Sequence, residues 1–234
     1  MEYQQSPVPE TAPEETLREP SAPQKPRKKF FDARTIAYFG ILTALDIVLL
    51  LWGSAIPVGA GGATLNFSLV PIVLGAILLG PVAGALLGLV AGVIILVMVV
   101  LGAQGAIFLA LFNVHPVVIA LVCLVKTTAA GLVSGLLYRL IRNKNQKAAV
   151  FTAAAAAPVV NTGLFILGLL CISGAVFEAS SEVFNYTSGA AIIVLGFVGY
   201  NFFIEFAINL VLAPALSTVI RVVEKRFVKK KRNA

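Results

Sequence analysis

The chain has 234 residues, of which 59% are hydrophobic and only 12% are charged. Soluble domains carry about a quarter charged residues, so this composition excludes an ordinary soluble domain and indicates a polytopic membrane protein. The net charge of +7 does not indicate nucleic-acid binding, because the basic residues cluster at the ends of apolar segments, as the positive-inside rule expects. No P-loop, GxSxG or HExxH motif is present, and neither cysteine has a partner at a metal-ligand spacing. We therefore expect neither an enzyme nor a metal site.

Residues 1–29 are rich in proline and glutamate, which leaves little apolar surface to bury, and we expect them to be a disordered cytoplasmic tail. A basic stretch follows, and after it come six apolar segments. Residues 30–225 are thus predicted to form an all-α membrane domain that binds a solute, and residues 226–234 a basic cytoplasmic tail. The six predicted membrane-spanning helices cover residues 35–56, 66–79, 81–101, 116–141, 148–172 and 191–220.

The positions of Lys and Arg support six spans with both termini in the cytoplasm. The loops 57–65, 102–114 and 173–190 contain no Lys or Arg. Six spans place all three outside the cell and every basic cluster inside. Joining residues 66–101 into one kinked helix is the alternative, since the segment 66–79 is short of the roughly 20 residues that a span usually needs. That alternative leaves a basic terminus outside, so we prefer six.

Small residues suggest where helices approach closely. Glycines recur every fourth residue from position 80 to position 92, and we expect them to pack inside the bundle. In the first span Ala37, Gly40 and Ala44 share one side, while Asp46 lies roughly opposite and should face the interior. The small side could dock another protein or pack within this chain.

Lys126 is the single charge near the middle of the segment 116–141, whose other charge, Arg139, lies at its end. A charged side chain at mid-membrane is costly and marks a candidate functional site. Asp46 and Glu205 also fall near mid-membrane, so one interpretation is an internal network of ion pairs. The other is a solute pocket with His115 in its outer wall and Lys126 at its floor.

Two further spans carry polar positions. Asn201, Glu205 and Asn209 form a continuous i, i+4, i+8 face in the last span, which lipid would not accommodate cheaply. Asn161 lies near the middle of the fifth. These side chains should therefore face the interior of the bundle.

Five stretches resemble the substrate-binding S component of energy-coupling factor (ECF) vitamin transporters. In chain order they are IAYFGILTAL, NFSLVPIVLGAILLGPVAGALLGLVAGV, HPVVIALVCLVKTTAAGLVSGLLYRL, PVVNTGLFILGLL and YNFFIEFAINLVLAPAL. The resemblance covers about residues 30–225. It lies in the order and spacing of these stretches together.

The resemblance implies a multi-pass protein of a prokaryotic cell (plasma) membrane that captures a vitamin or similar micronutrient from outside. Its partners would be a transmembrane T component and two cytoplasmic ATPases. ATP would be used by these partners, and no cofactor is expected in this chain. The family's AxxxA contact motif corresponds to Gly40 and Ala44, with Ala37 one turn earlier and glycine in place of the first alanine.

The family's substrate site lies toward the outer side, and here it corresponds to residues of the last three spans and the outer loops. The implied substrate-binding residues are His115, Lys126, Asn161 and Asn201, with Glu205 as a possible floor and Asn113 and Tyr186 as possible lid residues.

The class of solute and the function of the chain each have more than one interpretation. Lys126 suits a solute that bears a carboxylate, such as pantothenate, folate or biotin, but a neutral solute such as riboflavin is equally compatible if Lys126 pairs with Glu205. A stand-alone six-span carrier or channel that uses Asp46, Lys126 and Glu205 as an ion or proton relay is the alternative function. An assembly factor that uses only its small-residue faces is a third.

Overall fold

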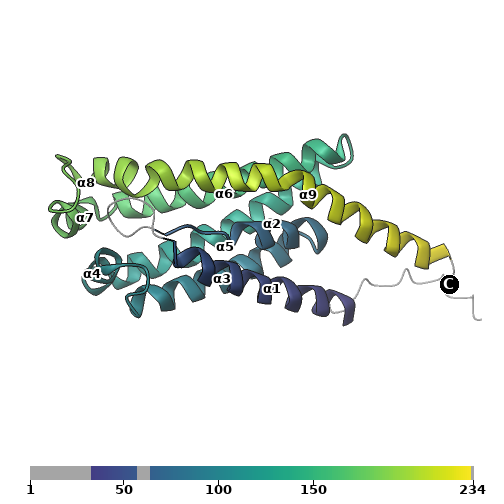
Figure 1. The fold of residues 1–234 in the computed structure, drawn as a ribbon, viewed down its shortest axis with the longest axis horizontal. Helices are drawn as coiled ribbons and strands as arrows, with labels where there is room; N and C mark the ends of the chain where they lie inside the picture. The colour runs from purple at the N-terminus through teal and green to yellow at the C-terminus, as the bar shows by residue number, and fades with distance from the viewer. Residues whose placement is uncertain (1–32, 57–63, 233–234) are drawn as a thin grey trace, which may run out of the picture. The chain divides into compact units, whose positions relative to one another are not determined.

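The computed structural model describes residues 33–56 and 64–232 (Figure 1). The tail predicted at 1–29 and most of the loop 57–65 lie outside these residues. The described residues form helices and no β-strands. The helices are α1 (Ala33–Ser54), α2 (Leu69–Leu78), α3 (Pro81–Val100), α4 (Ala106–Val114), α5 (Pro116–Ile141), α6 (Gln146–Leu170), α7 (Ser173–Ser180), α8 (Gly189–Ala191), the π-helical turn η1 (Ile192–Val198) and α9 (Gly199–Arg232).

Five helical segments are long and apolar enough to cross a membrane. They are Thr35–Ser54, Pro81–Val100, Pro116–Ile141, Gln146–Leu170 and Gly189–Val219. These segments confirm an all-α, multi-pass membrane protein. The sixth apolar segment forms α2, which has only 10 residues and a length of about 15 Å, half the thickness of the hydrocarbon core.

Helices α2 and α3 form an antiparallel hairpin around Gly80. This glycine has φ 108°, a value that favours glycine, and Pro81 begins α3. Across the turn, Gly75 of α2 packs against Leu87 of α3, and Gly84 packs against Ala76. The single kinked helix over 66–101 is therefore not formed.

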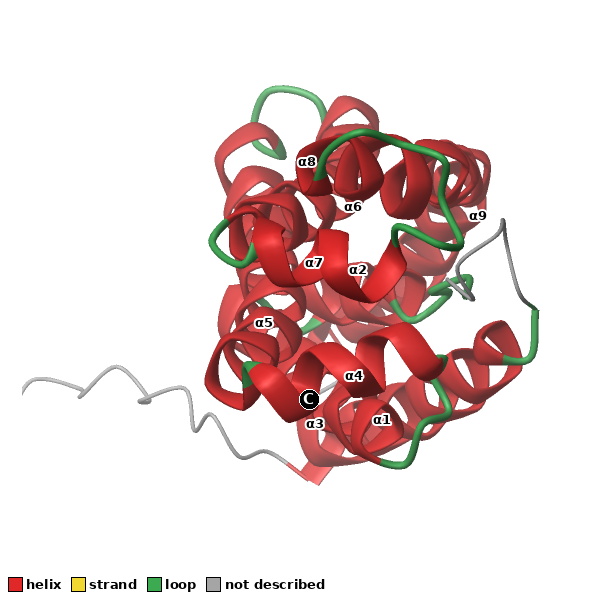
Figure 2. Ribbon diagram, turned by 90° about the vertical axis from the view of Figure 1, so that its left-hand side faces the viewer, coloured by secondary structure: helices red, strands yellow, loops and turns green. Residues whose placement is uncertain are grey.

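The helix termini gather at two ends of the bundle. Figure 1 shows the start of α1 and the end of α9 on the same side, with α4, α7 and α8 at the opposite end. Figure 2, viewed from that opposite end, shows α4 and α7 lying across it. The predicted loops 102–114 and 173–190 thus contain short helices.

Helix α9 continues beyond the predicted end of the membrane domain. Its backbone is helical from Gly199 to Arg232, through Pro214. The boundary predicted between residues 225 and 226 therefore does not coincide with the end of a helix.

Glycines hold α3 and α5 together at close range. A Cβ atom at Gly88 would collide with the carbonyl of Thr127, and one at Gly92 would lie 2.6 Å from the Cys123 oxygen. A Cβ atom at Gly131 of α5 would likewise collide with the carbonyl of Gly84. Because only glycine allows this approach, the predicted packing inside the bundle is confirmed for Gly84, Gly88 and Gly92, whereas Gly80 has no atom of the described residues near it and forms the turn before α3. The close contact fixes α5, and with it Lys126.

We predict that Gly88→Ala lowers stability by about 1–3 kcal/mol, the usual cost of overpacking. Gly40→Ala is the matched control, because no atom lies within 4 Å of a Cβ added there. Thermal unfolding of the purified protein in lipid nanodiscs measures both. An unfolding temperature for Gly88→Ala equal to that of Gly40→Ala would contradict the packing described.

Candidate substrate-binding site

The two faces of α1 differ as the sequence predicts. Asp46 is 0% exposed and lies on the same inward face as the buried Leu42 and Leu50. Ala37, Gly40 and Ala44 are exposed on the other face. Both carboxylate oxygens of Asp46 lack a hydrogen-bond partner among the described residues, so no observed contact ties Asp46 to Lys126.

The polar face of the last span points into the bundle, as predicted. Glu205 and Asn209 are buried at 4% and 1% exposure, and Asn201 is half-buried. Asn209 Nδ2 donates a hydrogen bond to the Glu205 carbonyl at 2.9 Å. This face follows directly after η1, and π-helical turns are frequent at functional sites.

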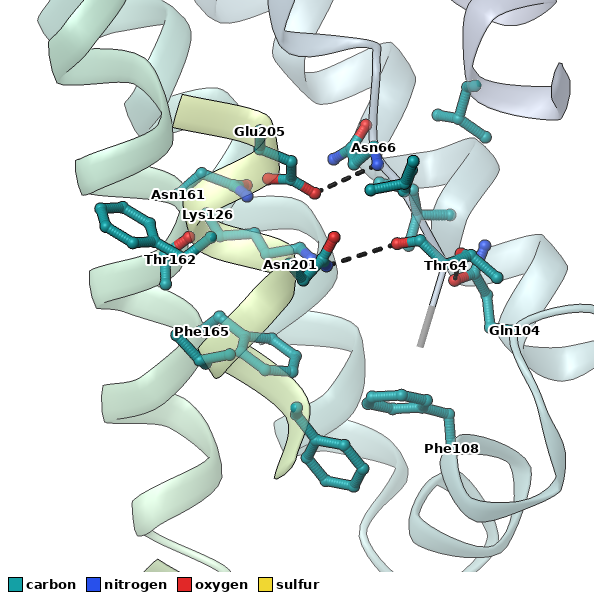
Figure 3. A pocket seen from close by; sticks show the side chains of 16 residues that line it. Thr64, Asn66, Gln104, Phe108, Lys126, Asn161, Thr162, Phe165, Asn201 and Glu205 are labelled. Atoms are coloured by element: carbon teal, nitrogen blue, oxygen red, sulfur yellow. Dashed lines mark hydrogen bonds between the residues drawn. The ribbon is translucent and has the colours of Figure 1, made fainter. Parts of the chain in front are cut away.

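The short segment that precedes α2 is held against this face by hydrogen bonds (Figure 3). The Asn66 backbone N–H donates to Glu205 Oε1 at 3.1 Å, and Asn201 Nδ2 donates to the Thr64 carbonyl at 3.3 Å. Thr64 Oγ1 in turn donates to Gln104 Oε1 at 3.1 Å. The segment therefore connects α9 to the turn before α4 and forms one wall of a cavity.

The cavity lies between this wall and helices α5, α6 and α9, and it measures about 680 Å³ including its opening. Polar and aromatic side chains face one another across it (Figure 3). The polar lining residues are Thr64, Asn66, Gln104, Lys126, Asn161, Thr162, Asn201 and Glu205, and the aromatic ones are Phe108, Phe165, Phe197 and Phe202.

Lys126 reaches the cavity without an ion-pair partner. Its Nζ lies 5.0 Å from the centre of the Phe165 ring, a cation–π contact. No carboxylate of the described residues lies within the 4.0 Å of an ion pair from its Nζ. The internal network of ion pairs between Asp46, Lys126 and Glu205 is therefore not formed in this structure.

Two amide oxygens of the cavity wall also lack partners. Asn161 Oδ1 and Asn201 Oδ1 are buried, and neither accepts a hydrogen bond from a described residue. For Asn201 the assignment of the oxygen follows from its other amide atom, since Nδ2 donates to Thr64. A buried acceptor without a donor is costly, so a molecule in the cavity that supplies N–H or O–H groups would satisfy both.

The structure gathers four of the seven predicted substrate-binding residues, since Lys126, Asn161, Asn201 and Glu205 all line the cavity. The other three are placed elsewhere.

His115 does not form the expected outer wall, because it lies at the junction of α4 and α5, away from the cavity lining. Asn113 does not line the cavity either, and its side chain is exposed. Helix α4 directs Phe108 to the cavity, and Asn113, five residues later, is rotated from Phe108 by about 140° around the helix axis. Tyr186 is exposed and stacks on Phe184, with ring centres 6.3 Å apart.

Several residues that line the cavity were not predicted from the sequence. Thr64 and Asn66 follow the glycine-rich loop, where nothing in the pattern shows that the chain returns to α9. Gln104 could have been found as one of only two amide side chains in residues 102–114. The rings of Phe108 and Phe165 carry no such signal, because phenylalanine is common in any apolar segment.

Comparison with protein families identifies one match. The family model for the substrate-specific component of ECF transporters matches residues 34–217. A comparison with curated protein sequences gave no match. The family match covers most of the chain and includes every residue that lines the cavity, so the chain belongs to the ECF transporter substrate-specific component family.

Proposed function

We propose that this S component captures a vitamin-like organic anion from outside the cell in the cavity around Lys126. The observation that carries this proposal is an ammonium group in the cavity with no carboxylate of the described residues within 4.0 Å, beside oxygens of Asn161 and Asn201 that accept no hydrogen bond from those residues. A charge in such a place usually pairs with another group or marks a substrate pathway. A carboxylate of the solute supplies the missing negative charge.

An acidic solute fits the hydrogen bonding better than a neutral one. A neutral solute requires Lys126 to be balanced by Glu205, but no carboxylate oxygen of Glu205 lies within 4.0 Å of Lys126 Nζ. Glu205 and the two asparagine oxygens instead offer acceptors to hydroxyl or amine groups of the same solute. We therefore favour a solute that combines one acidic group with hydrogen-bond donors.

We further propose that the chain crosses the plasma membrane of a prokaryotic cell six times, with both termini in the cytoplasm. In this proposal the segment 64–68 and α2 cross the membrane together as the sixth span. The backbone before α2 is hydrogen-bonded to α9. Supporting this orientation, the basic residues Arg139, Arg142, Lys144 and Lys147 surround the connection between α5 and α6.

The partners in this proposal are a T component and two ATPases, which hydrolyse the ATP that drives import. We propose that the T component docks on the exposed face of α1 formed by Ala37, Gly40 and Ala44. Packing within this chain does not explain these small residues, because they are exposed and an added Cβ at Gly40 meets no atom within 4 Å. Small residues allow a partner helix to approach closely.

We predict that Lys126→Met lowers the affinity for the solute by about 10- to 100-fold, the usual value of a hydrogen bond to a charged group. The measurement is the solute retained by the purified protein, identified and quantified by mass spectrometry. Lys144→Met, in an exposed loop, is the matched control and should retain the solute fully. Retention by Lys126→Met at the control level would show that Lys126 has only a structural role.

The double variant Gly40→Leu, Ala44→Leu should lose copurification of the T component while keeping its solute, because bulky side chains block close helix approach. Gly163→Leu on α6 is the control, since an added Cβ there also meets no atom within 4 Å. If the double variant copurifies its partner as well as the control does, the docking face lies elsewhere.

Reconstitution separates this function from that of a stand-alone carrier. In proteoliposomes the chain alone should bind the solute without accumulating it, and uptake should require the T component, the ATPases and ATP. Accumulation by the chain alone, driven by an ion or proton gradient, would contradict the proposal and favour a carrier that uses Asp46, Lys126 and Glu205.

A further inference from the structure

A second cavity, which we call the annex, adjoins the site on its α3 and α4 side. It measures about 370 Å³ including its opening. The annex and the main cavity share Ile95, Gln104, Phe108, Lys126 and Phe165. The two cavities therefore meet at the ammonium of Lys126 and at the two phenylalanine rings.

The remaining wall of the annex is apolar. It consists of Val99, Ile119, Val122, Cys123 and Leu169, contributed by α3, α5 and α6, and all five side chains are buried. The main cavity differs, because it offers the oxygens of Asn161, Asn201 and Glu205. Hydroxyl or amine groups would therefore lose hydrogen bonds on entering the annex, whereas hydrocarbon would gain from burial there.

We infer that the annex is a second binding subsite, which receives an apolar arm of the solute. The solute is then an organic anion whose acidic group meets Lys126 at the junction, whose donor groups face Asn161 and Asn201, and whose apolar arm lies among Ile119, Val122 and Cys123. This inference rests on the proposed function, since it takes the acidic group to be at Lys126.

Packing supports an occupied annex. Protein interiors are close-packed, and apolar side chains around an unfilled space lose dispersion contacts. An apolar arm of a few carbon atoms restores those contacts without placing a polar atom against Leu169 or Val99. The rings of Phe108 and Phe165 at the junction add apolar surface to the entrance.

A series of 2-hydroxy acids tests the inference: 2-hydroxypropanoate, 2-hydroxyhexanoate and 2-hydroxyoctanoate. Each carries a carboxylate for Lys126, a hydroxyl donor for the asparagine oxygens and an arm of different length. Binding is measured by calorimetry on the full chain in nanodiscs after removal of any retained solute. We expect the affinity to rise about fourfold for each added methylene group that the annex buries.

The outcomes separate the inference from the proposed function. If all three acids bind equally and Lys126→Met abolishes their binding, the annex does not receive the arm but the anion site stands. If none of the acids binds, both the anion site and the annex inference fail.

Two cysteines provide a matched pair of variants for locating the arm. Cys123→Leu fills the annex, whereas Cys171→Leu makes the same change at an exposed position outside both cavities. We expect Cys123→Leu to lose the gain in affinity with arm length, and Cys171→Leu to keep it. An equal gain in both variants would place the arm elsewhere and overturn the inference.

Ile119→Ala tests the same point by enlarging the annex rather than filling it, and so does not depend on Cys123→Leu folding. We expect the arm length of highest affinity to increase by about three carbon atoms, the number that the substitution removes. An optimum unchanged from that of the wild type would overturn the inference.

Discussion

The structure depends on a single electrostatic constraint, an ammonium group held inside an apolar bundle without contact to a carboxylate of the described residues. Lys126 is held there because α5 packs against α3 through backbone contacts at Gly88, Gly92 and Gly131, which leave the helix little freedom to turn. Burying a charge without a partner is costly. The surrounding residues reduce that cost only in part, through the cation–π contact with the Phe165 ring.

Other polar groups of the cavity also have atoms without a hydrogen-bond partner among the described residues. Glu205 and Asn201 each use one atom to hold the segment that precedes α2. Asn201 Oδ1 and Asn161 Oδ1 accept no hydrogen bond from any residue that the structure describes. A buried acceptor without a donor carries a free-energy cost, which a bound donor removes. A cavity that holds an ammonium group and amide oxygens without partners among the described residues is complementary to a solute that carries both charge and donors.

Much of this arrangement could be predicted from the sequence where a periodic pattern or a rare residue type carried the signal. The charge inside an apolar run identified Lys126, the spacing of four residues identified the inward face of Glu205 and Asn209, and helical geometry placed Asp46 opposite Gly40. Contacts between residues that lie far apart in the sequence could not be predicted in this way. Thr64 and Asn66 reach the cavity because the chain folds back along α9, and Asn113 misses it because of the rotation of α4 after Phe108. Neither position can be predicted from the composition of the surrounding residues.

The most direct measurement of the central interaction is an experimental structure of the protein with its retained solute. We predict that an acidic group of the solute lies at hydrogen-bond distance from Lys126 Nζ, about 3 Å, with its donor groups against Asn161 and Asn201. A neutral solute, with Lys126 in a direct ion pair with Glu205 or Asp46, would contradict this description of the site.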